Sequence, residues 1–192
     1  MRDFKVIQTL ILTQATADPR IRAVLLYGSR ANPNIMPDIF QDYDVLYFVT
    51  DLESFTTDHS WTNIFGEKII WQLPDEMSFG EKSDIRFSYL MLFKDGIRID
   101  LTLFPLDKFE SHFKRESQTI VWLDKDHLFP DISESSDRDY WIMKPIEKEF
   151  LDTCNEFWWM STYVSKGLRR NEITYAKEIM ETAVRPMMNE DD

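Results

Sequence analysis

Two carboxylates, Asp42 and Asp44, open an apolar run that extends from Val45 to Val49. In a β-strand, residues two apart point to the same face of the sheet, so these carboxylates are expected side by side. Two adjacent negative charges are unfavourable unless a cation neutralises them, and oxygen ligands suit Mg²⁺. The spacing therefore indicates a magnesium site, although a solvated strand start that carries two Asp residues would show the same pattern.

A third carboxylate, Asp100, lies in the alternating segment from Gly96 to Leu103. Alternation places its apolar residues on one face and Arg98, Asp100 and Thr102 on the other. If this strand runs close to the Asp42 strand, three carboxylates meet, and such a cluster supports phosphoryl transfer with two metal ions. The competing interpretation is a sheet-edge carboxylate paired with Arg98.

The tripeptide Gly28-Ser29-Arg30 follows a buried strand candidate, 21–27. Glycine lets the backbone approach a phosphate closely, and the Ser29 hydroxyl with nearby N–H groups can bind phosphate oxygens, more strongly where a helix starts. Arg30 would bind phosphate too, or pair with Asp38 or Asp42. A Gly-Ser turn without a ligand explains the dipeptide alone, but its position just before the Asp pair favours a nucleoside triphosphate.

Other nucleotide and metal sites are excluded by their missing motifs. The chain has neither Gly-x-x-x-x-Gly-Lys-Ser/Thr nor Gly-x-Gly-x-x-Gly, so it is neither a P-loop nor a Rossmann protein. The three histidines, His59, His112 and His127, are scattered and adjoin no Cys-rich segment, which argues against a zinc site.

Composition narrows the partners and the compartment. The 192 residues carry a net charge of -12, which disfavours nucleic acid and favours a cationic substrate or a metal, although solubility alone would also account for it. No apolar run is long enough to span a membrane, and the N-terminal residues lack a signal-peptide core. The single Cys154 forms no disulfide framework, as expected of a cytoplasmic protein. The sequence gives no indication of oligomeric state.

Apolar periodicity predicts an α+β protein, a mixed sheet flanked by helices, followed by the beginning of a helical region. An amphipathic helix is expected over 3–16, a short helix with a loop over 51–66, and a helix over 105–116. Strands are expected over 21–27, 42–50, 68–73, 87–93, 97–104 and 120–123. The dipeptide Asp95-Gly96 predicts a hairpin between two of these strands.

Residues 124–139 are rich in Asp and Ser and form the best linker candidate. Two helices are expected after it, over 146–168 and 171–188, with Gly167 ending the first and Asn171 capping the second. These features predict two domains. The first, over 1–135, contains the mixed sheet and the candidate carboxylates, and the second, over 136–192, is helical.

At this level of detail the sequence resembles a known family. The combination of Gly28-Ser29, Asp42-x-Asp44 and a distant Asp100 is similar to the nucleotidyltransferase superfamily of the DNA polymerase β type. The sequence as a whole resembles the aminoglycoside 6-adenylyltransferases, which modify streptomycin, along essentially the whole chain. The segments that carry this resemblance are Leu26-Tyr27-Gly28-Ser29-Arg30, Phe40-Gln41-Asp42-Tyr43-Asp44, 87–93, 99–103 and Asn155-Glu156-Phe157-Trp158-Trp159.

The resemblance implies transfer of AMP from ATP to a hydroxyl of streptomycin, with release of pyrophosphate and resistance to the antibiotic. It implies that Asp42 and Asp44 hold Mg²⁺ and that Asp100 is a metal ligand or the general base. Gly28, Ser29 and Arg30 would contact the triphosphate.

The helical region carries a further candidate. The resemblance makes Lys166 a triphosphate-binding residue, although a surface cation near a helix C-terminus would look the same. Family members are longer, so the helical domain over 136–192 is expected to be truncated. A different acceptor (another antibiotic, a protein or RNA) and a nucleotide-binding module without activity are the alternative functions.

Overall fold

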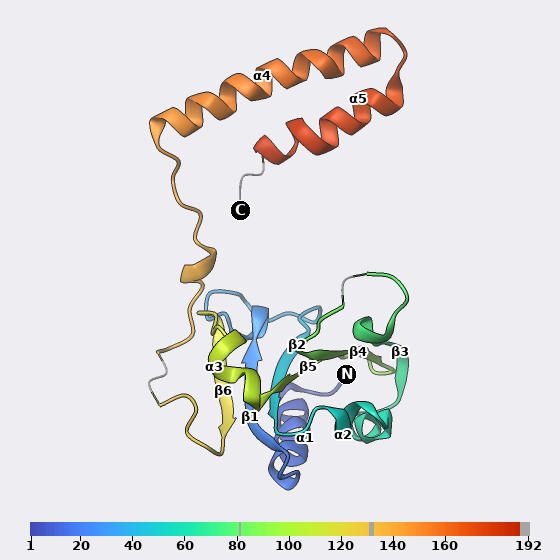
Figure 1. Ribbon diagram of the computed structural model, residues 1–192, viewed down its shortest axis with the longest axis vertical. Coiled ribbons are helices and arrows are strands. Elements are labelled where there is room, and N and C mark those ends of the chain that lie inside the picture. Colours follow the sequence, from blue (N-terminus) through green and yellow to red (C-terminus); the bar gives the residue numbers. More distant parts are fainter. Residues whose placement is uncertain (81, 131–132, 189–192) are drawn as a thin grey trace. The chain divides into compact units, whose positions relative to one another are not determined.

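The computed structural model describes residues 1–80, 82–130 and 133–188. Contacts within the chain divide it into two compact units, Met1–Asp139 and Tyr140–Asp192, and each is described by itself (Figure 1). The division falls four residues after the predicted domain boundary at residue 135.

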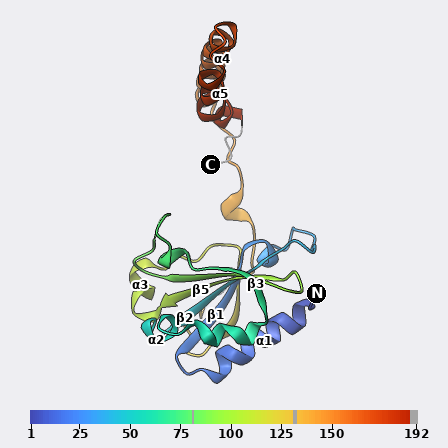
Figure 2. The ribbon, with the colours of Figure 1, turned by 90° about the vertical axis from the view of Figure 1, so that its right-hand side faces the viewer.

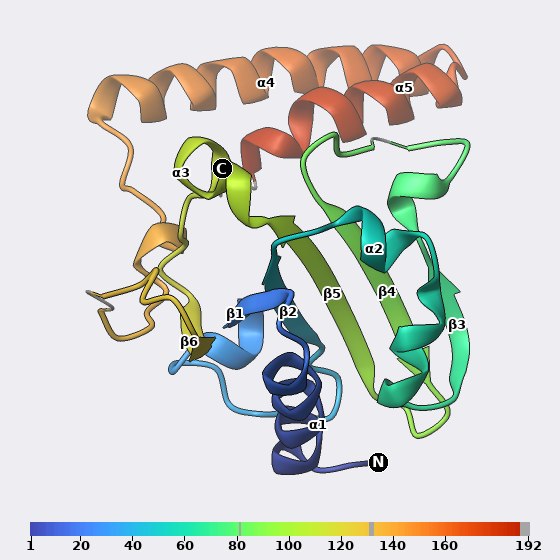
Figure 3. The same ribbon diagram turned by 60° about the horizontal axis from the view of Figure 1, so that its bottom comes forward.

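The first unit is built on a six-stranded mixed sheet with the strand order β3-β4-β5-β2-β1-β6. Figure 3 shows these strands side by side, from β6 at one edge to β3 at the other. Every predicted strand is present, with its ends within one residue of the prediction. The bounds are β1 Ile21–Tyr27, β2 Tyr43–Val49, β3 Lys68–Gln72, β4 Phe87–Phe93, β5 Arg98–Pro105 and β6 Thr119–Asp124. Only β2 and β5 pair in parallel, and the other neighbours are antiparallel.

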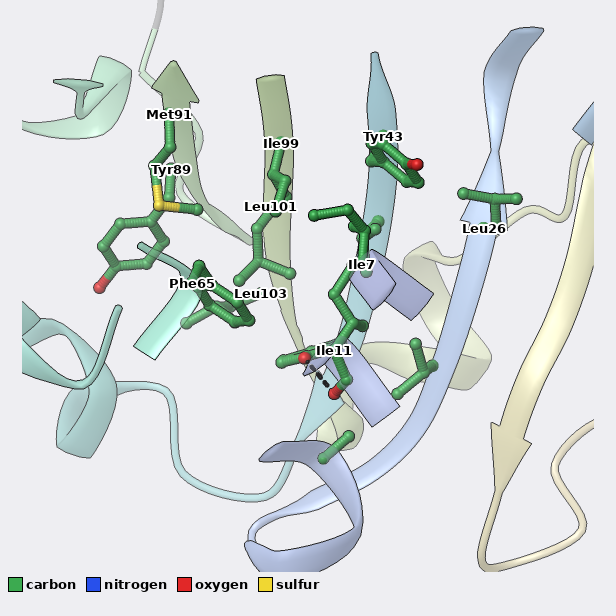
Figure 4. Packing of buried hydrophobic residues seen from close by; sticks show 14 of the residues in the cluster. Ile7, Ile11, Leu26, Tyr43, Phe65, Tyr89, Met91, Ile99, Leu101 and Leu103 are labelled. Atoms are coloured by element: carbon green, nitrogen blue, oxygen red, sulfur yellow. Dashed lines mark hydrogen bonds between the residues drawn. The ribbon is translucent and has the colours of Figure 1, made fainter. Parts of the chain in front are cut away.

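One face of the sheet is covered by α1, Phe4–Ala17, where the sequence predicted an amphipathic helix. Asp3 caps it by accepting a hydrogen bond from the backbone N–H of Val6. Ile7 and Ile11, one turn apart, are fully buried and face the apolar residues of β5 (Figure 4). The Tyr47 hydroxyl donates to the carbonyl of Ile11 over 2.8 Å, which satisfies the one polar atom of this buried ring.

The same face is completed by α2, Glu53–Thr56, and by a short 3₁₀ segment, η2, His59–Phe65. Figure 2 shows α1 and α2 on the same side of the sheet. Phe55 and Phe65 have no exposed surface, and Trp61 packs against their cluster.

On the opposite face a second apolar cluster covers only part of the sheet. It joins Leu25, Leu46, Phe48 and Phe104 to aromatic rings that follow β5. The helix predicted over 105–116 is wrong in extent. The structure has a 3₁₀ turn, η4 (Leu106–Lys108), and one turn of helix, α3 (Phe109–His112), before the backbone becomes extended.

The aromatic side chains explain why that helix is short. Phe109 and Phe113 stack with their ring centres 5.4 Å apart, and both pack edge-on against Phe48. The extended backbone at Phe113 then leads the chain into β6. The helix therefore ends early because an extended backbone at Phe113 allows these rings to be buried together in one cluster.

The hairpin predicted at Asp95-Gly96 is confirmed between β4 and β5. Gly96 has a φ of 82°, which glycine adopts without strain, and its N–H donates to the carbonyl of Phe93 over 2.9 Å. Asp95 also binds the Arg2 side chain, with a distance of 2.7 Å between Nε and Oδ2. The hairpin is thereby tied to the residues that precede α1.

The segment predicted as a linker is not a free connection where the structure describes it. The backbone N–H of Ser136 donates to the carbonyl of Ser117 over 3.0 Å, and the Ser135 hydroxyl donates to the carbonyl of Ala31 over 2.6 Å. Asp139 accepts from the backbone N–H of Ser117 over 2.7 Å. Its Ser and Asp side chains fasten the segment to the first unit, so composition alone gave the wrong interpretation.

The second unit consists mainly of α4, Glu147–Arg169, and α5, Ile173–Ile179. The helix predicted over 146–168 is confirmed, whereas the one predicted over 171–188 is broken. Beyond α5 the chain forms a π-helical turn, Met180–Val184, and then a 3₁₀ turn, Pro186–Met188.

Gly167 and Asn171 have roles that differ from those predicted. Gly167 lies inside α4 and is buried. A Cβ at this position would be only 3.0 Å from the Cβ of Ala176. Asn171 ends α4 in the left-handed conformation, with a φ of 61°, and does not cap α5, whose N-cap is Glu172. Gly167 thus permits the close approach of α4 and α5.

Candidate functional site

Parallel pairing of β2 with β5 places Asp44 directly opposite Asp100. Both side chains lie on the face opposite α1, because their strand neighbours Tyr43, Val45, Ile99 and Leu101 are buried in the core beneath that helix. Asp42 comes just before β2 and two residues before Asp44. The fold therefore brings the three predicted carboxylates together on one face of the sheet.

Arg98 binds two of the three carboxylates. Its Nη2 and Nε lie 2.6 Å and 2.9 Å from the two oxygens of Asp100, and its Nη1 lies 3.3 Å from Oδ2 of Asp42. The pairing of Asp100 with Arg98, which the sequence offered as the alternative, is thus present, but β5 lies between β4 and β2, so Asp100 is not at a sheet edge as that alternative expected. Sequence reasoning missed that the same guanidinium also reaches Asp42.

The electrostatics of the cluster are unfavourable for its negative charges. Burial, together with the charges of Asp100 and Asp42, raises the pKa of Asp44 to about 6. Burial also raises the pKa of Asp42, against the opposing effect of Arg98. A further cation would relieve this cost, since Arg98, whose guanidinium contacts two of the carboxylates, is half exposed.

The donor set of the cluster consists of carboxylate oxygens, which suits a hard divalent cation such as Mg²⁺. Across the described ranges, no three acidic, His or Cys side chains are arranged as a ready-made metal cage. Arg98 contacts both Asp42 and Asp100 in this structure. The residues therefore fit the metal chemically, while metal binding itself remains a prediction.

The Gly28 turn lies beside this cluster. Tyr27, the last residue of β1, pairs with Asp44, and the next residue, Gly28, has a φ of 72°. A Cβ on Gly28 would overlap Oδ2 of Asp44 and lie 3.1 Å from its Cγ. Only glycine fits here, so the backbone of the predicted phosphate turn touches a predicted metal ligand.

A short 3₁₀ helix, Gly28–Ala31, begins at this turn. The carbonyl of Ser29 accepts from the backbone N–H of Asn32 and from Nε2 of Gln41, each over 3.3 Å. A helix this short has a small dipole, so any phosphate binding here would depend on the local N–H groups and the Ser29 hydroxyl.

Arg30 is engaged with the backbone beside the cluster. Its Nε donates to the carbonyl of Asp42 over 2.9 Å and its Nη2 to the carbonyl of Gln41 over 2.6 Å. Its guanidinium also stacks 4.0 Å from the centre of the Tyr43 ring. In this conformation Arg30 positions the segment that carries Asp42. The contact with Asp42 that the sequence offered is made through the backbone carbonyl and not through the carboxylate.

Lys166 lies in the second unit, on the exposed side of α4. Its Nζ is 4.9 Å from the centre of the Tyr163 ring, three residues earlier on the same helix. Its predicted role at the triphosphate remains a prediction.

The mixed six-stranded sheet with its flanking helices defines the fold class as α+β, consistent with the nucleotidyltransferase fold. A solved structure supports this assignment. The crystal structure of an aminoglycoside 6-adenyltransferase from Bacillus subtilis is 41% identical, with a TM-score of 0.57, and the match covers 97% of this chain and 65% of that one.

The family follows from the sequence as a whole. The model of the family described as "Streptomycin adenylyltransferase" matches residues 1–190, and the chain belongs to that family. Curated relatives named aminoglycoside 6-adenylyltransferase include one from Campylobacter jejuni, 46% identical over 96% of this chain and 64% of the relative. Those from Bacillus subtilis strain 168 and Staphylococcus aureus are 47% and 42% identical over 97% of this chain. They are covered over 66% and 67% of their lengths, so the chain spans about two thirds of the relatives that it matches.

The described part of the chain contains no helix that is both long and apolar enough to cross a membrane.

Proposed function

We propose that the chain binds ATP with Mg²⁺ at the acidic cluster and transfers AMP to a hydroxyl of an aminoglycoside, foremost streptomycin. The observation that carries this proposal is the juxtaposition of Asp44 and Asp100 on adjacent strands, with the backbone of Gly28 against Asp44. The names of the family and of its curated relatives support the same reaction.

In this proposal Asp42 and Asp44 hold the metal, which would neutralise charge on the α-phosphate and on the leaving pyrophosphate. Asp100 takes the proton of the acceptor hydroxyl. The hydroxyl oxygen forms a bond to the α-phosphorus while the bond from that phosphorus to the bridging oxygen breaks, and pyrophosphate leaves with the electron pair. The guanidinium of Arg98 has to release Asp100 for this proton transfer, because it donates two hydrogen bonds to that carboxylate.

Binding of the triphosphate is assigned to the Gly28 turn and the Ser29 hydroxyl. Arg30 contributes by holding the Asp42 segment and, with a change of rotamer, by direct contact with phosphate. Lys166 of α4 is the further candidate for that contact.

The acceptor is proposed from charge. Streptomycin is polycationic, and a chain with a net charge of -12 that gathers three carboxylates on one face of its sheet attracts such a ligand. Modification of a hydroxyl by AMP would prevent the drug from acting and so confer resistance. ATP and Mg²⁺ are available in the cytoplasm, which is the proposed location.

The test is release of pyrophosphate from ATP in the presence of MgCl₂ and streptomycin. Asp42→Asn and Asp44→Asn are expected to abolish the release while circular dichroism stays unchanged, and Asp107→Asn, at an exposed residue beyond β5, serves as the matched control. No release from folded protein would refute the activity. Release with another aminoglycoside but not with streptomycin would reassign the acceptor.

A further inference from the structure

A hollow of about 250 Å³ lies beside the acidic cluster, on the same face of the sheet. Leu25 and Tyr27 of β1 and Leu46 of β2 line its floor, and Phe113 lines its side. Pockets for a whole drug-sized ligand usually measure about 300–1,000 Å³. This hollow therefore suits one part of a ligand, such as a nucleobase with its sugar.

The charge of its rim differs from that of the rest of the chain. Two basic side chains, Arg86 and Lys114, and His112 stand against one acidic side chain, Glu116. A polycationic aminoglycoside is disfavoured at such a rim. A neutral aromatic ring that carries a negatively charged phosphate chain is favoured, because basic groups attract the phosphates and apolar walls accept the ring.

The position of the hollow relative to the cluster fits a nucleotide. Leu46 is two residues beyond Asp44, about 7 Å along β2. Tyr27, which lines the hollow, is the register partner of Asp44. The distance from Asp44 to the hollow is therefore short enough for a single sugar to connect a phosphate at Asp44 to a base in the hollow.

The direction of the hollow agrees with the geometry of the proposed reaction. The Gly28 turn follows β1 and Asp100 lies on β5, so they flank β2, which carries Asp44, on opposite sides. In an in-line displacement the entering and leaving oxygens lie on one line, and this line would cross the strands. The nucleoside oxygen leaves phosphorus roughly at right angles to that line, and the direction along the strands toward Leu46 meets this requirement.

We propose that this hollow binds the adenosine part of ATP, with the base packed against Leu46 and the rings of Tyr27 and Phe113. The inference rests on the proposed function and assigns a place to the nucleoside of its co-substrate. A second hollow of about 240 Å³, lined by Ile70, Leu92 and Arg98, flanks the cluster on the β4 side and provides a matched control.

The experiment measures the dissociation constants of ATP and of inorganic tripolyphosphate, each with MgCl₂, by calorimetry on the full chain. Leu46→Trp fills the proposed hollow and Leu92→Trp fills the second one. We expect Leu46→Trp to weaken ATP at least about tenfold and to leave tripolyphosphate within about twofold, because only ATP has a base to displace. Leu92→Trp is expected to leave both constants unchanged.

Several outcomes would overturn the inference. They are unchanged ATP binding in Leu46→Trp, weaker ATP binding in Leu92→Trp alone, and weaker streptomycin binding with normal ATP binding in Leu46→Trp. Wild-type protein that binds tripolyphosphate as tightly as ATP also contradicts it. Wild-type protein that binds neither ligand would refute the proposed nucleotide site as a whole, which separates the two failures.

A second measurement decides the question if Leu46→Trp does not fold or loses both ligands equally. In wild-type protein with labelled leucine methyls, ATP is expected to shift the NMR signals of Leu25 and Leu46 more than those of Leu90 and Leu92. Tripolyphosphate is expected to leave all four nearly unshifted. A larger ATP-specific shift at Leu90 and Leu92 would place the nucleoside in the second hollow and overturn the proposal.

Discussion

The backbone of Gly28 lies against the carboxylate of Asp44, so closely that no side chain fits between them. Gly28 belongs to the turn after β1, and Asp44 to the neighbouring strand β2. This contact joins the two halves of the proposed site, because a phosphate bound by the turn would lie next to a metal bound by the carboxylate. The glycine is needed twice, for its φ of 72° and for the absence of a Cβ.

Gly28→Ala is expected to abolish ATP binding, because the added methyl group displaces the Asp44 carboxylate. Gly80→Ala is the matched control, since Gly80 has a φ of 91° but no atom within 4 Å of its virtual Cβ. Both variants should lose about 1 kcal/mol of unfolding free energy from the left-handed backbone. Calorimetry with ATP and MgCl₂ separates them, and equal ATP binding by the two variants would show that the Gly28–Asp44 contact is irrelevant to the site.

Arg98 competes with a metal ion for the acidic cluster, because its guanidinium binds both Asp42 and Asp100. Arg98→Gln should therefore tighten Mg²⁺ binding while lowering the unfolding free energy without metal by about 1 kcal/mol. Thermal unfolding with increasing MgCl₂ measures both effects, since a ligand stabilises the state that it binds.

Arg22→Gln is the control for this experiment, because Arg22 binds Asp126 away from the cluster. It should change stability slightly and leave the response to MgCl₂ as in the wild type. If Arg98→Gln responded to MgCl₂ less than the wild type, Arg98 would support the metal site and not compete with it.

Much of the fold was predictable, because the strands of the sheet alternate or are continuously apolar and α1 repeats at helical spacing. The pairing of Asp44 with Asp100 was predictable only as a possibility, since strand order depends on contacts between distant segments. The pairing of Arg98 with Asp100 was predictable from the sequence. The additional contact of Arg98 with Asp42 and the bonds of Arg30 to backbone carbonyls were not, because such contacts leave no spacing rule in the sequence.

The wrong predictions for the linker and for Gly167 have a common cause, which is packing between segments that are distant in the sequence. Asp and Ser residues over 124–139 looked like a linker, although several of them bond to Ser117 and Ala31. Gly167 looked like a helix end, although its role is set by Ala176 of another helix. Local composition does not show these distant partners.

Asp95 should make stability depend on pH in the acid range. The Arg2 side chain lowers the pKa of Asp95 to about 2, below the usual value of 3.8. A carboxyl group with a depressed folded-state pKa stabilises the fold above its unfolded pKa, and this contribution disappears as the pH falls from about 4 to about 2.

Asp95→Asn should thus lower the unfolding free energy by about 1 kcal/mol at pH 7, after allowance for solvent screening of this partly exposed pair. The deficit should shrink below about pH 4, because the wild-type carboxylate becomes protonated there. Urea unfolding between pH 2 and pH 7 measures it, with Asp107→Asn as an exposed control. A deficit that stays constant across this range would mean that the ion pair with Arg2 contributes nothing.

Gly167→Ala tests whether the second unit depends on the close approach of α4 and α5. In an isolated helix this change is stabilising by about 1 kcal/mol. Here the new Cβ would lie 3.0 Å from the Cβ of Ala176 and 3.1 Å from the Tyr175 ring. The Ala176 methyl cannot rotate away, so the helices must separate and we expect net destabilisation.

Glu156→Ala, at an exposed position on the same helix, should be neutral or stabilising. Thermal unfolding followed by circular dichroism compares them, and a stabilised Gly167→Ala would show that the helices do not need this contact.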